Sequence, residues 1–329
     1  MNLLIFASLP MSTAAQEIVM AFACANALRL RNLRAAPWLP AAGALAVVWV
    51  LSALASGNAR EGLGHAWQLA PLVAVAAHRG GEMVERIGLL AASFAAIWAG
   101  CQWAAGGIGH AAFPQHLTLA YALLPPLGVA AARGRWATVC ILLTGIAATR
   151  SDGAILATLA TLAVARFGRP TLILGGAALA TVALLPLLAN ADELRQRSVL
   201  WTGGLSLLDA RGVGAGAYGA ASAGAYDNLS PGFYFPNHAH DAAIQLLAVL
   251  GPAGLVAAAA FVAVVFRTAA SAASAGLVGI LVGGLTQDTW GDLEVIRAAL
   301  AWLALIGSRA RNSGASDLGT LRPAEGPIC

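Results

Sequence analysis

Long apolar stretches that are almost free of charge constrain this chain more than any other feature of its sequence. Several of them run for about 16 to 20 residues, close to the roughly 20 that an α-helix needs to cross a lipid bilayer. Inside lipid, every backbone N–H and C=O group has to be hydrogen-bonded within the protein, and a helix does this within one segment. We therefore expect an all-α, polytopic transmembrane helix bundle.

The composition agrees with this expectation. Only 10% of the 329 residues are charged and 59% are hydrophobic, whereas a soluble domain carries about 25% charged residues. All 19 basic residues are arginines, spread along the whole chain. We expect no nucleic-acid partner, and mechanisms that need a lysine side chain are excluded. The four cysteines are scattered without a CxxC pair, which argues against a disulfide framework or a zinc site.

Eleven or twelve membrane spans are predicted, because the first apolar stretch forms either one helix or two. That stretch, Leu3–Leu28, is interrupted at Pro10 and at Gln16–Glu17. The other spans are predicted at Trp38–Ala55, Gly62–Ala77, Gly88–Ala105, Leu117–Ala132, Trp136–Thr149, Gly153–Ala165, Thr171–Ala189, Asp241–Phe266, Ala270–Thr286 and Val295–Gly307. Residues 1–308 then form a single transmembrane domain.

The arginines orient this domain, because basic residues are retained in cytoplasmic loops. Thirteen of them fall in one set of alternate loops and the C-terminal tail, and six fall in the opposite set. Residues 309–329 are therefore predicted to be a disordered cytoplasmic tail, and the long loop 190–240 lies on the outer side. Within that loop, we expect Arg197–Leu208 to form a short interfacial helix. Its membrane-facing side chains would be Leu200, Trp201, Leu205 and Leu208.

The densest cluster of reactive side chains is Pro236–Asn237–His238–Ala239–His240–Asp241, at the start of a long apolar helix. Asn237 is the expected N-cap, which places both histidines in the first turn. There the positive end of the helix dipole favours neutral imidazole, which accepts protons. If the helix starts at His238, that residue shares a face with Asp241 and is an alternative base to His240. A metal site here is disfavoured, because histidines two apart diverge on a helix and no further ligand cluster stands out.

Arginines on the outer side form a second constellation. Arg150 lies in Thr149–Arg150–Ser151–Asp152–Gly153, a short break between two apolar runs, where a buried charge is costly and marks a functional candidate. The alternative is an ion pair between Arg150 and Asp152 or an acidic residue of a neighbouring loop. Arg197 and Arg211 lie in the long loop. Guanidinium groups bind phosphate oxygens in a bidentate manner, so together these arginines suit a pyrophosphate.

Two glycine-rich stretches have structural interpretations. Gly212–Val213–Gly214–Ala215–Gly216 is not a nucleotide-binding fingerprint, because no strand precedes it. It is predicted to permit a tight turn or a close backbone approach. Gly251–Pro252–Ala253–Gly254 is predicted to kink the helix that follows His240, because Pro252 has no N–H to donate.

In their order along the chain, these motifs resemble the O-antigen ligase and O-antigen polymerase superfamily of membrane glycosyltransferases. The ligase pattern is His, then Asn, Ser or Gln, nine residues, Gly, two residues, and Gly, Thr or Tyr. This chain reads His240, Asp241, nine residues, Gly251, two residues, Gly254, and departs only at Asp241. A carboxylate there raises the pKa of the neighbouring imidazole, against the effect of the helix dipole.

Two further elements carry the resemblance. The break around Arg150 is similar to the family's Ser-Arg-Gly segment, with an insertion before Gly153. The run Arg197–Ser198–Val199–Leu200–Trp201, followed by Gly212–Val213–Gly214, is similar to the family's Arg-then-Trp element before a Gly-x-Gly stretch. The resemblance covers about Leu142–Leu255; the N-terminal third matches only in hydropathy.

The resemblance implies a GT-C-like bundle that acts as an inverting glycosyltransferase, without metal or cofactor, at the periplasmic face of a bacterial inner membrane. The donor would be a glycan on undecaprenyl pyrophosphate. The acceptor would be a hydroxyl of lipid A–core for a ligase, or of a growing O-antigen or exopolysaccharide chain for a polymerase. The implied catalytic residues are His240 as the general base and Arg150 and Arg197 at the leaving pyrophosphate. The implied substrate-binding residues are Arg211, His238, Asp241 and Trp201.

Other functions stay open at this point. The spacing from His240 to Gly251 favours a ligase, while Asp241 and the short chain weaken that preference against a polymerase. A membrane transporter or flippase is the alternative from a different class. It would place polar residues at mid-membrane on discontinuous helices, whereas here they gather at one face.

Overall fold

A computed structural model of the chain describes residues 4–5, 13–30, 38–77, 82–113, 115–168, 191–214, 217–229, 239, 241–268, 271–285, 289 and 292–312. Regular structure within these ranges is entirely helical, and they contain no strand. The all-α expectation is therefore confirmed for the part of the chain that the structure describes.

The helices of these ranges are short to medium in length and follow one another closely. In the first half of the chain they are α2 (Thr13–Leu30), α3 (Leu39–Ala55), α4 (Ala59–Trp67), α5 (Ala70–Ala77), α6 (Glu82–Ala104), α7 (His116–Ala122), α8 (Leu124–Ala132), α9 (Trp136–Ala148) and α10 (Asp152–Phe167). In the second half they are α12 (Ala191–Ser206), α13 (Tyr218–Leu229), α14 (Ala242–Thr268), α15 (Ser271–Gly283) and α16 (Leu293–Asn312).

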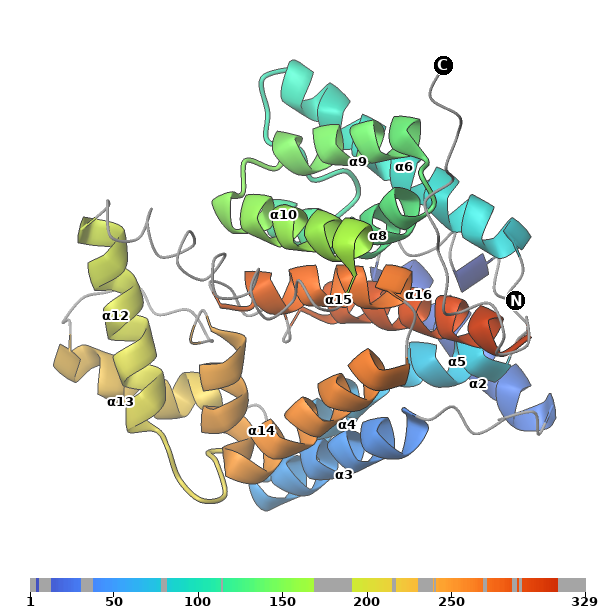
Figure 1. The fold of residues 1–329 in the computed structure, drawn as a ribbon. Helices are drawn as coiled ribbons and strands as arrows, with labels where there is room; N and C mark the ends of the chain where they lie inside the picture. The colour runs from blue at the N-terminus through green and yellow to red at the C-terminus, as the bar shows by residue number, and fades with distance from the viewer. Residues whose placement is uncertain are drawn as a thin grey trace, which may run out of the picture.

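The helices are arranged in groups that pack on a central pair. In Figure 1, α6, α8, α9 and α10 lie at the top, α15 and α16 cross the middle, and α3, α4 and α14 lie below. α8 and α10 contact α15, α16 contacts α5 and α7, and α3 contacts both α4 and α14. α12 and α13 stand at the left edge, where α12 contacts α14. The candidate site residues of the long loop therefore lie beside the helix that follows His240.

The interior is formed by helices that are buried all round. Every side chain from Val295 to Ile306 of α16 is buried, Arg297 included. The same holds from Thr118 to Ala130, which covers most of α7 and α8. These helices are enclosed by protein, so their apolar character is explained by core packing.

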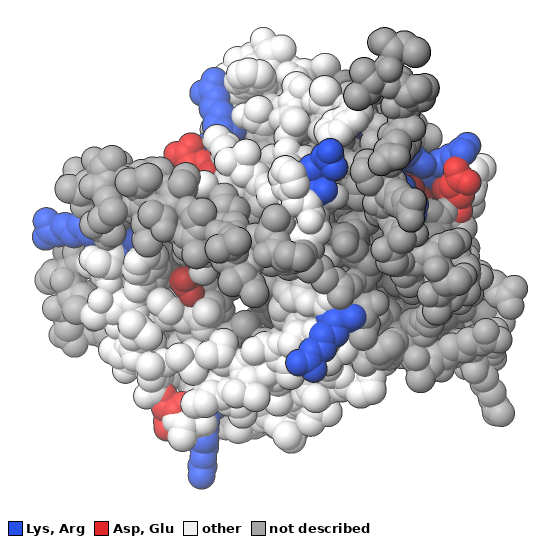
Figure 2. Space-filling model, viewed as in Figure 1, with Lys and Arg blue, Asp and Glu red and all other residues white. Residues whose placement is uncertain are grey.

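Other helices turn apolar side chains outward. On α6, Leu90, Phe94 and Ile97 are 69%, 65% and 53% exposed, at the i, i+4, i+7 spacing of a single stripe. On α3, Leu51 and Leu54 are each 59% exposed. Figure 2 shows a surface on which charged side chains stand singly or in small groups among uncharged ones. Apolar faces of this extent mark contact with a partner or a membrane.

Two of the described helices are long and apolar enough to cross a membrane, by length and composition. They are α6 and the Ala242–Arg267 part of α14, with mean hydropathies of 1.4 and 2.4. Only 33% and 39% of their most apolar windows are buried inside the protein, so neither is an enclosed core helix. Five further apolar stretches are shorter: Leu39–Ala55, Leu63–Val75, His116–Ala132, Trp136–Ala148 and Ser274–Gly283.

Several predicted boundaries differ from the observed ones. The predicted span Leu117–Ala132 is divided between α7 and α8 at Leu123, because Pro125 and Pro126 fit the first turn of a new helix, where their missing N–H groups are not needed. The predicted span Gly62–Ala77 is similarly divided by a turn at residues 68–69. The predicted interruption at Gln16–Glu17 is wrong, since α2 runs through it.

The predicted C-terminal tail agrees only in part with the structure. α16 continues to Asn312, so the predicted tail begins with four helical residues, 309–312. The predicted span Thr171–Ala189 lies outside the described residues. So does the rest of the tail, from residue 313.

The predicted long loop is largely helical. α12 begins at Ala191, six residues before the expected interfacial helix, and α13 was not predicted at all. Leu205 and Leu208 are 45% and 46% exposed, as expected of a face turned to the membrane. Leu200 is buried and Trp201 half-buried, so their predicted membrane-facing position is wrong. They face inward because α12 packs against α13 and α14.

Candidate functional site

One face of α12 is directed towards the start of α14. Arg197, Trp201 and Gly204 follow one another at i, i+4 and i+7, so they share that face. A Cβ added at Gly204 would lie 2.7 Å from Ile244 Cγ2 and 3.2 Å from Ala239 Cβ. Glycine at this position therefore allows α12 to approach the two residues that flank Asp241. The packing brings Gly204 together with two residues that follow it by 35 and 40 positions in the sequence.

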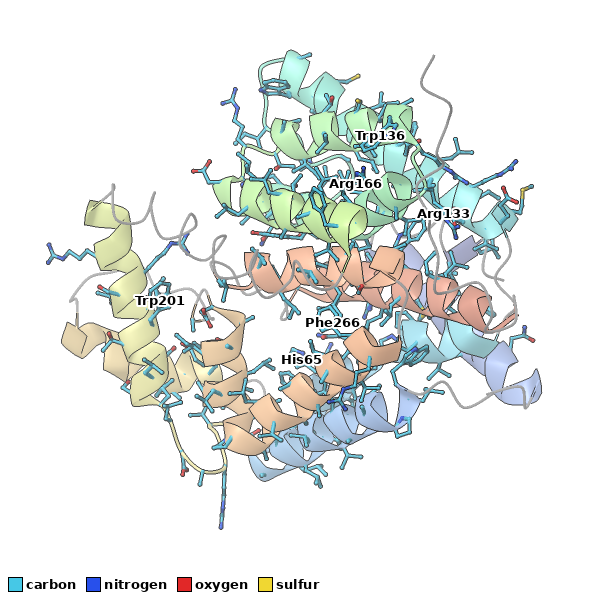
Figure 3. The ribbon with its side chains drawn as sticks, viewed as in Figure 1. His65, Arg133, Trp136, Arg166, Trp201 and Phe266 are labelled. Carbon is cyan, nitrogen blue, oxygen red and sulfur yellow. The ribbon has the colours of Figure 1, made fainter. Side chains whose placement is uncertain are left out.

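Trp201 provides an open hydrogen-bond donor at this junction. Its side chain is half-buried, and Figure 3 shows it on the side of α12 that faces α14. The indole Nε1 is buried and has no hydrogen-bond acceptor among the residues that the structure describes. A buried indole N–H normally finds a partner, so this one suits an oxygen atom of a bound molecule or of water.

The two arginines of this region differ in environment. Arg197 is half-buried on α12, on the same face as Trp201. Arg211 is exposed on the turn that follows α12, next to Gly212. Only Arg197 thus lies on the packed face of α12.

Asp241 is the N-cap of α14. The Ile244 N–H donates to its Oδ1 at 2.8 Å, and the helix begins at Ala242. Ala239 lies before the helix, and its N–H donates to Gln245 Oε1 at 2.8 Å. The predicted helix start, with both histidines in the first turn, is therefore wrong. A carboxylate is among the strongest N-caps, and Asp241 takes that role ahead of Asn237.

The surroundings of Asp241 fix its position and change its acidity. The Ala242 N–H donates to the Gly284 carbonyl at 2.8 Å, which ties the start of α14 to the end of α15. Burial raises the pKa of Asp241, and the N–H groups of Ile244 and Ala243 oppose that rise in part. Asn237, His238 and His240 lie outside the described residues.

The predicted kink in α14 is confirmed at Gly251, which has φ 68°. In an unbroken helix the Ala248 carbonyl would accept from residue 252, but Pro252 has no N–H. The Val213 N–H donates to the Ala248 carbonyl instead, at 2.8 Å. The chain segment after α12 thus supplies a donor that the broken helix lacks.

The adjacent carbonyl of α14 is held in a similar way. The Val249 carbonyl accepts from the Gly214 N–H at 3.0 Å and from Ser52 Oγ of α3 at 3.3 Å. A Cβ at Gly212 would collide with the Val249 carbonyl oxygen, and a Cβ at Gly214 would collide with the Ser56 side chain. The predicted close backbone approach of this glycine stretch is confirmed.

Arg150 lies on the turn between α9 and α10, in a left-handed conformation with φ 54°. Its N–H donates to the Ala147 carbonyl at 3.0 Å, and Ser151 Oγ accepts from the Ala154 N–H at 3.2 Å to cap α10. The side chain is exposed, so the expectation of a charge buried at depth is wrong. Within the described part of the chain it makes no ion pair with Asp152.

A tightly bonded loop adjoins this turn and was missed by sequence reasoning. The Gly109 N–H donates to the Ala148 carbonyl at 2.9 Å. Gln102 Oε1 accepts from the N–H groups of His110, at 2.9 Å, and Ala111, at 2.7 Å. Ala111 has φ 50°, and it and Arg150 are the non-glycine residues of the described ranges with positive φ. The signal in the sequence that could have indicated this loop was Gln102, a single polar residue at the end of an apolar span, followed by several glycines.

A second aspartate cap was also missed. Asp292 Oδ1 accepts from the Val295 N–H at 3.3 Å, at the start of α16, and its Oδ2 accepts from Thr118 Oγ1 at 2.6 Å. Burial, with a smaller contribution from the charge of Glu294, raises the pKa of Asp292 to about 6. The cluster joins α7 to α16 beside the buried core.

The structure brings together part of the predicted site. Arg197 and Trp201 share the face of α12 whose Gly204 packs against Ala239 and Ile244, and these two residues lie on either side of Asp241 in the chain. Arg211 lies nearby in the chain but is exposed, and no hydrogen bond or ion pair among the described residues joins Arg150 to the junction. Within the same ranges no three His, Cys, Asp or Glu side chains are placed to hold a metal ion. Because His238 and His240 fall outside them, metal independence stays a prediction.

No protein-family model matches this chain, and no curated protein matches its sequence.

Proposed function

We propose that this chain is a polytopic membrane glycosyltransferase of the O-antigen ligase type. It transfers a glycan from undecaprenyl pyrophosphate to an acceptor hydroxyl at the periplasmic face of a bacterial inner membrane. One observation carries the proposal beyond the motifs themselves. The α12 face that bears Arg197 and Trp201 packs, through Gly204, against Ala239 and Ile244 on either side of Asp241. Two motifs separated by about 40 residues therefore adjoin in space.

The outward apolar stripes support a membrane setting. The stripes on α3 and α6 would each expose a row of large apolar side chains to water in a soluble protein. In a bilayer the same rows contact lipid tails at no cost. The shorter apolar helices, with the pairs α4–α5 and α7–α8 each counted as one broken span, complete the polytopic bundle of the proposal.

The proposed reaction is a single displacement. His240 takes the proton of the acceptor hydroxyl as the new bond forms between the acceptor oxygen and the anomeric carbon. The bond from that carbon to the pyrophosphate breaks on the opposite face, so the configuration inverts. Undecaprenyl pyrophosphate leaves with the bonding electrons, and Arg150 and Arg197 stabilise its charge by bidentate hydrogen bonds. No metal ion or cofactor takes part.

Trp201 and Asp241 have supporting roles in this scheme. The unpaired indole N–H of Trp201 donates to a sugar oxygen at the junction of α12 and α14. Asp241 fixes the start of α14 by capping it. Arg211 and His238 contribute to substrate binding at the edge of the site.

A repeat-unit polymerase of the same superfamily is the second candidate. Asp241 stands where the ligase pattern has an amide or a hydroxyl, and this departure favours it. A transporter or flippase fits less well. The broken helix α14 would offer it free carbonyls for an ion, but the Ala248 and Val249 carbonyls are bonded to Val213 and Gly214.

A reconstitution assay tests the proposal. Purified protein in lipid nanodiscs is mixed with an undecaprenyl-pyrophosphate-linked glycan and lipid A–core, in excess chelator. We expect glycosylated core; a ladder of longer lipid-linked glycan formed without core identifies a polymerase. Absence of both products contradicts the proposal. Activity lost in chelator and restored by one divalent ion revives the metal site of His238, His240 and Asp241.

Orientation has a separate test. Reporter fusions at residue 134, between α8 and α9, and at residue 225, in α13, are expected to give opposite signals. This expectation rests on the distribution of the arginines, with thirteen in one set of alternate loops and the C-terminal tail and six in the opposite set. The same signal at both positions would remove the periplasmic site and with it the proposed donor.

A further inference from the structure

We propose that residues 212–214, which we call the glycine clamp, position the two halves of the candidate site relative to each other. The clamp fixes how α12, with Arg197 and Trp201, lies against the first segment of α14, which follows Asp241. The effect of the clamp on transfer rests on the proposed function. Its effect on geometry depends only on described residues.

The first segment of α14 needs an external support at its C-terminal end. Gly251 has φ 68° and ψ −173°, so the helix axis is interrupted after Leu250. Without the clamp the Ala248 carbonyl would lose its donor, because Pro252 has no N–H, and the Val249 carbonyl would keep Ser52 Oγ of α3. Buried carbonyls without donors cost about 1 to 3 kcal/mol each. The N–H groups of Val213 and Gly214 bond them at 2.8 and 3.0 Å.

Only glycine fits at the two ends of the clamp. Gly212 and Gly214 have φ of 69° and 93°, a region that other residues rarely adopt. A Cβ at Gly212 would meet the backbone of α14, which cannot yield without breaking the clamp. A Cβ at Gly214 would meet the side chain of Ser56, which follows α3. Three elements, the clamp, α14 and α3, therefore meet without space for a side chain.

The first segment of α14 is consequently held at both ends by the same stretch of chain. At its start, Ile244 lies against Gly204 of α12. At its end, the Ala248 carbonyl is bonded to Val213, seven residues after the last residue of α12, Ser206. Two separated contacts between a pair of elements fix their relative rotation, whereas one contact leaves it free. This is why the clamp positions Trp201 relative to Asp241 rather than only capping a broken helix.

The geometry is tested with a cysteine pair that reports the approach of α12 to α14. In a chain whose four native cysteines are alanines, Gly204→Cys and Ala239→Cys place two Cβ atoms about as close as a disulfide requires, roughly 3.5 to 4.5 Å. Ile244→Ala makes room for the new side chain at 204. The rate of disulfide formation is then measured with and without Gly214→Ala.

A matched control separates backbone strain from the loss of the clamp. Gly134 has φ 67°, in the same left-handed region, but a Cβ there meets nothing within 4 Å. Gly134→Ala therefore carries the conformational cost alone. A rescue variant adds Ser56→Gly to Gly214→Ala, which removes the side chain that the new Cβ would meet.

We expect Gly214→Ala to slow disulfide formation at least fivefold and to lower kcat for transfer from the undecaprenyl-pyrophosphate-linked glycan by 10- to 100-fold, with a smaller change in KM. Misplacement by about 1 Å has effects of this size. Gly134→Ala should change neither rate, and Ser56→Gly should restore most of both. Disulfide formation at the parent rate in Gly214→Ala, or a failure of Ser56→Gly to restore it, would overturn the clamp. If the unmodified chain transfers no glycan, the proposed function fails, while the disulfide rates still decide the clamp.

Discussion

The turn at Arg150 and the glycine clamp use the same left-handed backbone for opposite reasons. At Gly212 and Gly214 the space is filled by α14 and by Ser56, so a side chain is excluded. At Arg150 the side chain is exposed, and an L-residue in this conformation costs about 1 to 2 kcal/mol relative to glycine. Strained residues that persist where a cheaper one would fit are often functional. Crowding thus accounts for glycine at the clamp, whereas nothing in the packing requires arginine at 150, and the proposed function supplies a reason for it.

The largest effect is expected at His240, on the α14 side of this comparison. His240→Ala should reduce transfer by roughly 10²- to 10⁴-fold, the usual contribution of a general base. The measurement is transfer in membranes that contain unchanged amounts of protein. His238→Ala serves as the control and should be milder. Abolished transfer in His238→Ala with normal transfer in His240→Ala would exchange their roles, and normal transfer in both would remove the proposed catalytic base.

The turn at Arg150, the other region of the comparison, is tested with two substitutions that differ in backbone strain. Arg150→Ala and Arg150→Gly should each lower kcat by roughly 10²- to 10³-fold, because both remove one charge-stabilising donor group. Only Arg150→Gly should also stabilise the fold, by about 1 kcal/mol, because it relieves the left-handed strain. Thermal unfolding in detergent measures the second effect.

Lysine substitution at Arg150, and alanine and lysine substitutions at Arg197, extend the same experiment. Arg150→Lys should restore little activity, since a point charge does not reproduce the bidentate fork. Arg197→Ala should be comparably severe, and Arg197→Lys should also rescue poorly. Full transfer by Arg150→Gly would show that the guanidinium is not used, and the strained turn would then lack a chemical reason.

A smaller effect is expected from Asp292, a buried cap outside both regions. Its pKa is raised to about 6 by burial, so the folded protein holds a proton that the unfolded chain releases near pH 4. Stability from this group is therefore largest at low pH and falls as the pH rises from about 4 to about 6, by roughly 1 to 3 kcal/mol. Asp292→Asn should flatten the pH dependence of Tm over that interval. If Tm of the variant changes with pH as steeply as that of the parent chain, the pH dependence comes from another group.

The smallest effect is expected at Asp241. Substitutions there distinguish its role as the N-cap of α14 from a role of its carboxylate in transfer. Asp241→Ala removes the acceptor of the Ile244 N–H and should cost about 1 kcal/mol of stability. Asp241→Asn keeps a good cap and restores the amide of the ligase pattern, so its Tm should stay close to that of the parent chain. Transfer by the two variants shows whether the carboxylate matters beyond the cap. If Asp241→Ala leaves Tm unchanged, the cap contributes nothing measurable.

Helix identity was predictable where it depended on local chemistry. The apolar run from Trp38 and the break at Gly251–Pro252 were both placed correctly, because hydropathy and the missing N–H of proline act within a few residues. The start of α14 was not. Asn237 and Asp241 are both good caps, and local propensity does not choose between them. The choice follows from the bond of Ala242 to Gly284 and of Ala239 to Gln245.

Residue chemistry alone was enough to predict the helices, their apolar character, the break of α14 after Leu250, and the close approach at Gly212 and Gly214. Each of these depends on side-chain size, polarity or a missing donor, which are properties of single residues. The packing of the helices was needed to show what the glycines approach, that Trp201 faces inward, and that Arg150 is exposed. Those outcomes depend on which surfaces meet, and contacts between residues far apart in the sequence leave no local pattern to read.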